Sequence, residues 1–210
     1  MSEPLALHSL PLFPLGSVLF PGGLLPLRIF EVRYLDMIGK CHKAGAPFGV
    51  VGLTQGVEVR VAGAGAEAFH PVGTLASIDS LESPQPGLLL VRCTGLQRFR
   101  IQHSERLPHG LWLADVTPML EDSAVDVPPD LQDTADALAR VLQTLRERAG
   151  AEVPIHEPYR LDDCGWVANR WCELLPVPLE LQQRLMALDN PLVRLELVSD
   201  VLARTGISGA

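Results

Sequence analysis

The sequence lacks the long apolar runs and the clustered basic residues that direct proteins to membranes or nucleic acids. No apolar run reaches the roughly eighteen residues needed to cross a bilayer, and the start at Met1–Pro4 has no basic region typical of a secretion signal. The formal net charge is -8, and phosphate groups repel an acidic chain. We therefore expect a cytoplasmic protein that binds neither nucleic acid nor a membrane.

Cysteines and histidines at metal-ligand spacing are also lacking. The four cysteines form no Cys-x-x-Cys pair, and the six histidines form no His-Glu-x-x-His motif. On a helix, Cys164 and Cys172 would share one face but lie about 12 Å apart, too far for a disulfide. We expect buried free thiols and no metal site.

The signatures of nucleotide binding and catalysis are absent as well. The sequence contains no GxxxxGK[ST], GxGxxG or GxSxG motif, and Gly63–Gly65 is interpreted as the tip of a hairpin. The acidic pairs Glu121–Asp122 and Asp162–Asp163 stand beside predicted helix starts, which favours helix capping over paired catalytic carboxylates. We predict no catalytic residue and no cofactor.

The first part of the chain, up to about Leu120, has the pattern of a β-rich unit with one helix. Apolar segments alternate with glycine and proline, and the clearest predicted strands are residues 72–78, 88–93, 96–101 and 111–116. In the third of these, Phe99 should face the core, and Arg98 should face solvent. Helical spacing predicts one amphipathic helix over residues 31–44, ended by Gly45.

After an acidic, proline-containing connection at residues 121–130, the apolar period becomes helical. Residues spaced four and three apart predict a helix from Leu131 to Ala149 that ends at Gly150. Three more helices are predicted, with starts at Asp162 or Asp163, at Pro176 or Pro178, and at Asn190–Pro191, the last ending at Gly206. The pattern predicts an α+β fold with two domains, residues 1–121 and 122–210.

Several short phrases occur in a recognisable order: LPLFPL (10–15), LFPG (19–22), LPLRIFEVRY (25–34), FGVV (48–51), VGTLA (72–76), GLQRFRI (95–101), LLPVPL (174–179) and LDNP (188–191). In order and spacing they resemble the N-terminal substrate-recognition domain family of Lon proteases, over nearly the whole chain. The resemblance implies a PUA-like β pseudo-barrel with one embedded helix, followed by a C-terminal helical bundle.

The same resemblance implies a protein-interaction module. In Lon proteases this domain precedes an ATPase module and a peptidase module, and contributes to the recognition of unfolded or damaged proteins. We expect a free-standing domain that binds unfolded or apolar polypeptide segments or a separate protease, with neither ATPase nor peptidase activity. A small-molecule-binding enzyme or hydrolase that uses a barrel pocket is the alternative. An apolar face left open on the last helix would favour a homodimer.

The candidate peptide-binding residues are apolar and lie in or beside a stretch rich in proline and glycine. Such side chains can form an exposed groove for an extended peptide, or they can seal the open end of a barrel, and both alternatives remain open. The first-turn carboxylate Glu31 should favour the helix dipole, and Arg33 should tie the helix to the barrel. The candidates are Phe20, Leu24, Leu25, Phe30 and Tyr34.

Overall fold

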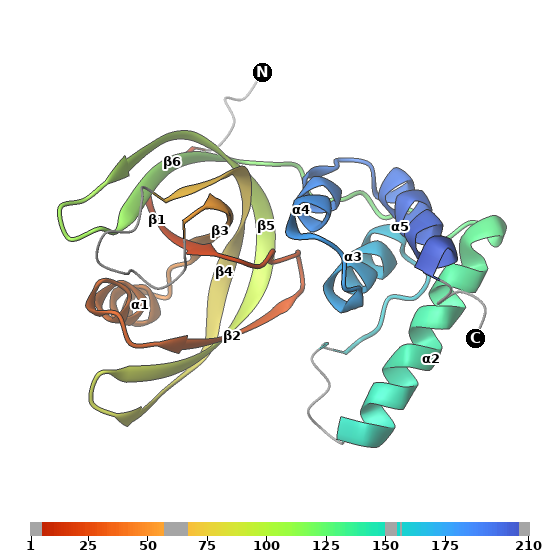
Figure 1. Cartoon of the computed structure of the whole chain (residues 1–210), viewed down its shortest axis with the longest axis horizontal. Coiled ribbons are helices and arrows are strands. Elements are labelled where there is room, and N and C mark those ends of the chain that lie inside the picture. The colour runs from red at the N-terminus through yellow and green to blue at the C-terminus, as the bar shows by residue number, and fades with distance from the viewer. Residues whose placement is uncertain (1–5, 57–66, 150–154, 156, 206–210) are drawn as a thin grey trace. The chain divides into compact units, whose positions relative to one another are not determined.

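The computed structural model describes residues 6–56, 67–149, 155 and 157–205 (Figure 1). The chain divides into two compact units, Met1–Leu120 and Glu121–Ala210. In its described residues the first unit contains six strands and one helix, and the second contains helices. The α+β fold predicted from the sequence is confirmed.

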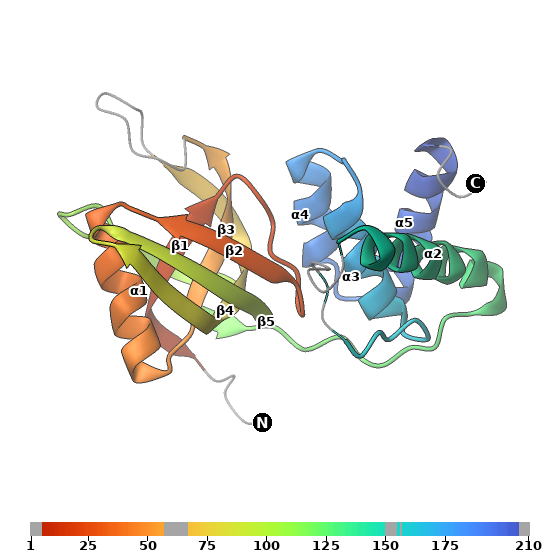
Figure 2. The same ribbon diagram turned by 90° about the horizontal axis from the view of Figure 1, so that it is seen from below.

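Six strands of the first unit form one sheet, which closes on itself (Figure 2). The strand order is β2-β5-β4-β3-β1-β6, and β6 also pairs with β5, so that β2 alone lies outside the ring, beside β5. The strand β1 runs parallel to β3, and the other pairings are antiparallel. The strands are β1 Leu7–Leu15, β2 Leu24–Ile29, β3 Phe48–Gln55, β4 Ala68–Gln85, β5 Leu88–Arg106 and β6 Trp112–Pro118.

The strands predicted at residues 88–93 and 96–101 are one continuous strand, β5. Gly95 does not end the strand; it lets another part of the chain come close. Its N–H donates to the carbonyl of Gly23 (2.8 Å), and its carbonyl accepts from the N–H of Gly22 (2.7 Å). A Cβ atom at position 95 would lie 2.2 Å from the carbonyl oxygen of Phe20. The glycine is therefore required by a close backbone approach rather than by a turn.

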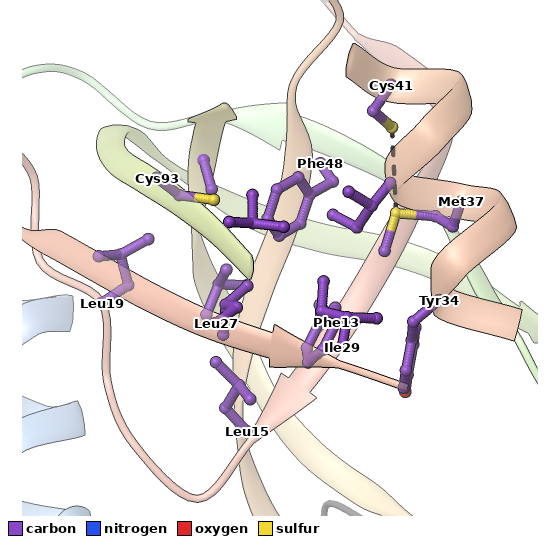
Figure 3. Close-up of a cluster of buried hydrophobic side chains, with 14 of the residues drawn as sticks. Phe13, Leu15, Leu19, Leu27, Ile29, Tyr34, Met37, Cys41, Phe48 and Cys93 are labelled. Carbon is purple, nitrogen blue, oxygen red and sulfur yellow. Dashed lines mark hydrogen bonds between the residues drawn. The ribbon is translucent and has the colours of Figure 1, made fainter. Parts of the chain in front are cut away.

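Alternating residues of the strands supply two separate hydrophobic clusters. Leu12 and Val51 belong to a cluster formed by strands alone, which we call the strand cluster. Their neighbours Phe13 and Val50 belong to a second cluster, which also includes residues of the helix α1 (Figure 3). We call this second group the α1 cluster; its α1 members are Tyr34, Met37, Ile38 and Cys41.

The alternation predicted for β5 is wrong at Arg98, which is buried rather than exposed to solvent. Its guanidinium group donates to the carbonyl of Leu120 (3.3 Å), and its own carbonyl accepts from the N–H of Met119 (2.8 Å). Phe99 is buried as predicted. Its ring lies beside Gly49 and Gly73, where the lack of a side chain leaves room for it. Arg98 and Phe99 are therefore both shielded from solvent.

The helix α1 spans Val32–Ala44 and ends at Gly45 as predicted, because Gly45 adopts a left-handed conformation with φ 60°. Glu31 is the N-cap residue, but its side chain makes no capping hydrogen bond. Tyr34 stacks on Phe13 of β1, with ring centroids 4.1 Å apart. This stacking attaches the first turn of α1 to the sheet (Figure 3).

The described residues of the second unit form a 3-10 turn and four helices (Figure 1). The predicted helix starts are confirmed: Asp163 accepts from the N–H of Trp166 (2.8 Å), Pro178 precedes the next helix, and Asn190 accepts from the N–H of Leu192 (3.0 Å). The predicted ends at glycines 150 and 206 lie outside the described residues. The elements are η1 Pro129–Leu131, α2 Gln132–Ala149, α3 Cys164–Leu174, α4 Leu179–Ala187 and α5 Pro191–Thr205.

Arg194 of α5 is a buried ionic centre of the helical unit. Its guanidinium group donates to both carboxylate oxygens of Asp122 (2.5 and 3.1 Å) and to the side-chain oxygen of Asn169 in α3 (3.0 Å). It also donates to the carbonyls of Leu185 (2.9 Å) and Leu188. Asp122 of the predicted capping pair therefore binds a distant arginine, and its carboxylate also lies beside the first turn of α3, 3.0 Å from where a Cβ atom of residue 165 would stand.

Candidate functional site

A pocket of about 500 Å³ lies within the barrel unit. Three segments form it: the helix α1, the start of β1, and the turn between β5 and β6 together with the beginning of β6. Each wall of the pocket thus comes from a different part of the chain.

The floor of the pocket is apolar and continues the α1 cluster. Met37, Cys41 and Leu111 line the pocket and belong to that cluster, and Leu107 and Leu113 pack against it. Figure 3 shows Met37 and Cys41 on α1, joined by the contact of their sulfur atoms (3.9 Å). An apolar group placed in the pocket would therefore extend an existing hydrophobic layer.

The rim of the pocket is polar except at Val32. Val32, Asp36 and Lys40 are four residues apart on α1 and form one exposed row. Among the described residues, Val32 is the most exposed of the large apolar residues after Leu120, with 75% of its surface accessible. His109 lies on the rim opposite, in the turn between β5 and β6. The rim carries charges of both signs.

Ser9, at the β1 side of the pocket, has an unusual backbone conformation. Its φ is 55°, in the left-handed region that residues other than glycine rarely adopt. The register between β1 and β6 shifts between Leu7 and Leu10, and the N–H of Ser9 donates to the carboxylate of Asp115 (3.1 Å). This hydrogen bond holds the pKa of Asp115 below its ordinary value, with a smaller contribution from His8. Bulges of this kind redirect side chains beside binding sites.

Arg33 fastens two walls of the pocket to each other. It is buried, and it donates to the carbonyl of Gly110 (2.7 Å) in the β5–β6 turn. It also pairs with Glu31 (3.0 Å) and Glu67 (3.2 Å), and Glu67 accepts from the indole N–H of Trp112 in β6 (2.9 Å). These bonds tie α1 to the turn and to β6, as expected for a structural arginine.

The structure does not gather the five candidate residues on one exposed surface. Phe20 and Tyr34 are buried, and Leu24 and Leu25 are partly buried in β2. Phe30 is 54% exposed. The sequence prediction missed Val32, although Val32 falls outside the buried stripe of α1 and is apolar, a combination that indicates an exposed hydrophobic residue.

The four cysteines are free and buried, as predicted. Burial raises the pKa of all four thiols, to about 12 for Cys93 and Cys172. A thiolate nucleophile is therefore disfavoured at neutral pH. In the part of the chain that the structure describes, no three His, Cys, Asp or Glu side chains are placed to hold a metal ion. The hairpin tip predicted at glycines 63 and 65 lies outside the described residues.

Glu173 should make the stability of the helical unit depend on pH. Burial raises its pKa from 4.5 to about 7, while the guanidinium group of Arg170 (2.9 Å) opposes the rise. The folded protein then retains a proton that the unfolded chain releases, so the contribution of Glu173 to stability should be full below pH 4.5 and fall as pH rises to about 7. The loss should approach roughly 3 kcal/mol, measured by urea unfolding at several pH values.

The substitution Glu173→Gln should abolish most of this pH dependence, because a neutral amide has no proton to release. Glu180→Gln is the control, since the Glu180 side chain is 57% exposed on α4. Parallel pH profiles for Glu173→Gln and the unchanged protein would contradict the expectation.

The family model of the ATP-dependent protease La (LON) substrate-binding domain matches residues 9–204. The chain belongs to the Lon substrate-binding domain family. This Lon substrate-binding domain is similar to a Lon N-terminal domain protein from Xanthomonas campestris, with 32% identity and a TM-score of 0.72. The similarity covers 92% of this chain and 98% of the Xanthomonas chain.

Two further relatives are more distant. The Lon protease of Anaeromyxobacter dehalogenans is 26% identical over 201 residues, which are 93% of this Lon substrate-binding domain but 23% of that protease. The N-terminal domain of Lon protease from the Mycobacterium avium complex shares the fold, with a TM-score of 0.60 at 17% identity. Among the described residues, no helix of this domain is long and apolar enough to span a membrane.

Proposed function

We propose that this Lon substrate-binding domain recognises unfolded or apolar polypeptide segments and has neither ATPase nor peptidase activity of its own. The observation that carries the proposal is an apolar pocket with an exposed valine, Val32, at its rim. Phe30, which is exposed as well, precedes Val32 by two residues. An exposed apolar residue at the rim of an apolar pocket is typical of interaction surfaces.

The chemistry of this surface suits unfolded clients. Unfolded chains present apolar side chains and extended backbone, which folded proteins bury. Binding to the pocket requires only that an apolar group leaves water, so it needs no nucleotide. The second predicted partner, a separate protease, is supported by the relative from Anaeromyxobacter, in which the matching segment is part of a Lon protease.

The alternative, a hydrolase that uses the barrel pocket, has less support. Cys41 is the thiol that lines the pocket, and burial raises its pKa. The sulfur atom lies against the thioether of Met37 (3.9 Å), which cannot accept a proton as a general base would. The pocket is therefore better suited to holding a ligand than to attacking one.

A reduced and alkylated client protein, which cannot refold, should bind this domain without ATP. The same client in its folded, disulfide-bonded form should bind at least about tenfold more weakly, because its apolar side chains are buried. Isothermal titration calorimetry of both forms measures the difference, and electrophoresis of the client after incubation shows whether it is cut. Equal affinity for the two forms would refute unfolded-segment recognition, and cleavage of the client would refute the absence of peptidase activity.

The homodimer and the cytoplasmic location remain predictions.

A further inference from the structure

We infer that the pocket beside α1 is an anchor site, which takes one large aliphatic or aromatic side chain of an extended polypeptide while the flanking backbone lies along the start of β1. This inference rests on the proposed function and deepens it, since it assigns a place and a side-chain preference to the binding. The occupant is a client segment with one bulky apolar residue.

The pocket is large enough for such an anchor. Its volume of about 500 Å³ lies within the range of roughly 300–1,000 Å³ found for small-molecule pockets, which leaves room for the largest apolar side chains. The floor residues Met37 and Leu111 already belong to the α1 cluster. An inserted side chain therefore meets an apolar surface that is formed before the ligand arrives. Methionine in the floor can adjust to anchors of different shape, which suits a site that accepts many sequences.

The neighbouring strand indicates a polypeptide rather than a compact small molecule. In the described chain, β1 pairs with β3 only from Leu12 to Leu15, so the segment from Leu7 to Pro11 has β6 as its one strand neighbour. Ser9 and Pro11 of this segment line the pocket. An extended client can thus lie along this segment. The N–H of Ser9 already binds Asp115 and Pro11 has no N–H, so side chains rather than a ladder of main-chain hydrogen bonds make the contact with the client.

The rim explains why the anchor residue, and not the client's charge, should decide affinity. Asp36 and Lys40 stand on the same exposed row of α1 and have opposite signs. A basic and an acidic residue next to the anchor would each find one attractive and one repulsive neighbour. Exposed charges also contribute little because water screens them.

The test compares two matched variants, Val32→Asp and Val193→Asp. Both valines are exposed and lie in the first turn of a helix, where a carboxylate favours the helix dipole, so both variants should fold. Val32 lines the pocket, and Val193 does not. The probes are the alkylated client protein and fluorescein-labelled ten-residue peptides of glycine and serine with one central Phe or Ala.

We expect the Phe peptide to bind more tightly than the Ala peptide, by about tenfold or more, because only Phe fills the pocket. Val32→Asp should remove this preference and weaken client binding about tenfold, whereas Val193→Asp should change neither. Fluorescence anisotropy measures the affinities, and circular dichroism verifies that both variants fold. With a benzoylphenylalanine in the central position, crosslinks should fall on Met37 or on Val32.

Each other outcome overturns a defined part of the inference. If the client binds the unchanged protein but Val32→Asp has no effect, or if crosslinks fall outside the pocket, the anchor site is wrong and the proposed function stands. If N-acetyl-phenylalaninamide binds as tightly as the Phe peptide, the backbone track along β1 is wrong. If neither client nor peptide binds, the proposed function fails, and the anchor site fails with it.

Discussion

Replacement of Arg194 by alanine is expected to destabilise the helical unit by about 3–5 kcal/mol, the range seen when one partner of a buried ion pair is removed. Arg194 is buried and binds the side chains of Asp122 and Asn169. It also binds the carbonyl of Leu185, near the end of α4. Its loss would leave a carboxylate and several oxygen acceptors without their donor and would open a cavity.

Urea unfolding followed by circular dichroism at 222 nm would measure this loss, because most of the helix in the chain lies in α2–α5. Arg204→Ala is the matched control on the same helix, since Arg204 is exposed, and it should change stability by less than about 0.5 kcal/mol. A loss below about 1 kcal/mol for Arg194→Ala would show that the network is not a main source of stability.

The second large effect is expected for Gly95→Ala, which should destabilise the barrel unit by about 2–3 kcal/mol through overpacking. The added methyl group would lie 2.2 Å from the carbonyl oxygen of Phe20, and the backbone would have to move. This movement would break the hydrogen bonds that join Gly95 to Gly22 and Gly23. The connection between β1 and β2 would then lose its attachment to β5.

Gly39→Ala is the control with the same chemical change. Gly39 lies in α1, and a Cβ atom at this position would have no atom within 4 Å, so alanine should stabilise the helix by about 0.5–1 kcal/mol. Thermal unfolding of both variants would show shifts in opposite directions. A Gly95→Ala protein as stable as the unchanged one would mean that the connection relaxes without cost.

The sequence predicted those features that depend on near neighbours in the chain. The caps at Asp163 and Asn190 act on N–H groups two or three residues away. The stop at Gly45 depends on the backbone freedom of that one residue. Such signals are complete within a few positions, and the helix starts could be placed for this reason.

The features that the sequence did not reveal depend on distant partners. Asp122 binds an arginine 72 residues away, and nothing near Asp122 indicates it. The prediction placed a break between two strands at Gly95. The loop that explains this glycine comes from residues 20–23, which are distant in the sequence. Arg98 was expected in solvent. The residues that cover it, Met119 and Leu120, come only after β6, and Leu120 is 22 residues away in the sequence.

The candidate site was only partly predictable for the same reason. Phe30 and Tyr34 are close in sequence, yet one is exposed and the other stacks in the core. Phe30 lies before the first residue of α1, so the helical spacing that places Tyr34 in the buried stripe of α1 does not apply to Phe30. The pocket could not be inferred, because its walls come from α1, β1 and the β5–β6 turn, which the chain brings together only on folding.

The burial of all four cysteines has a practical consequence for the experiments on this domain. Each thiol is shielded, and burial raises the pKa of each one. Maleimide reagents react with accessible thiolates, so the native cysteines should compete poorly for a dye at neutral pH. A single cysteine added at an exposed position can therefore carry a fluorophore or spin label, with the four native residues left in place.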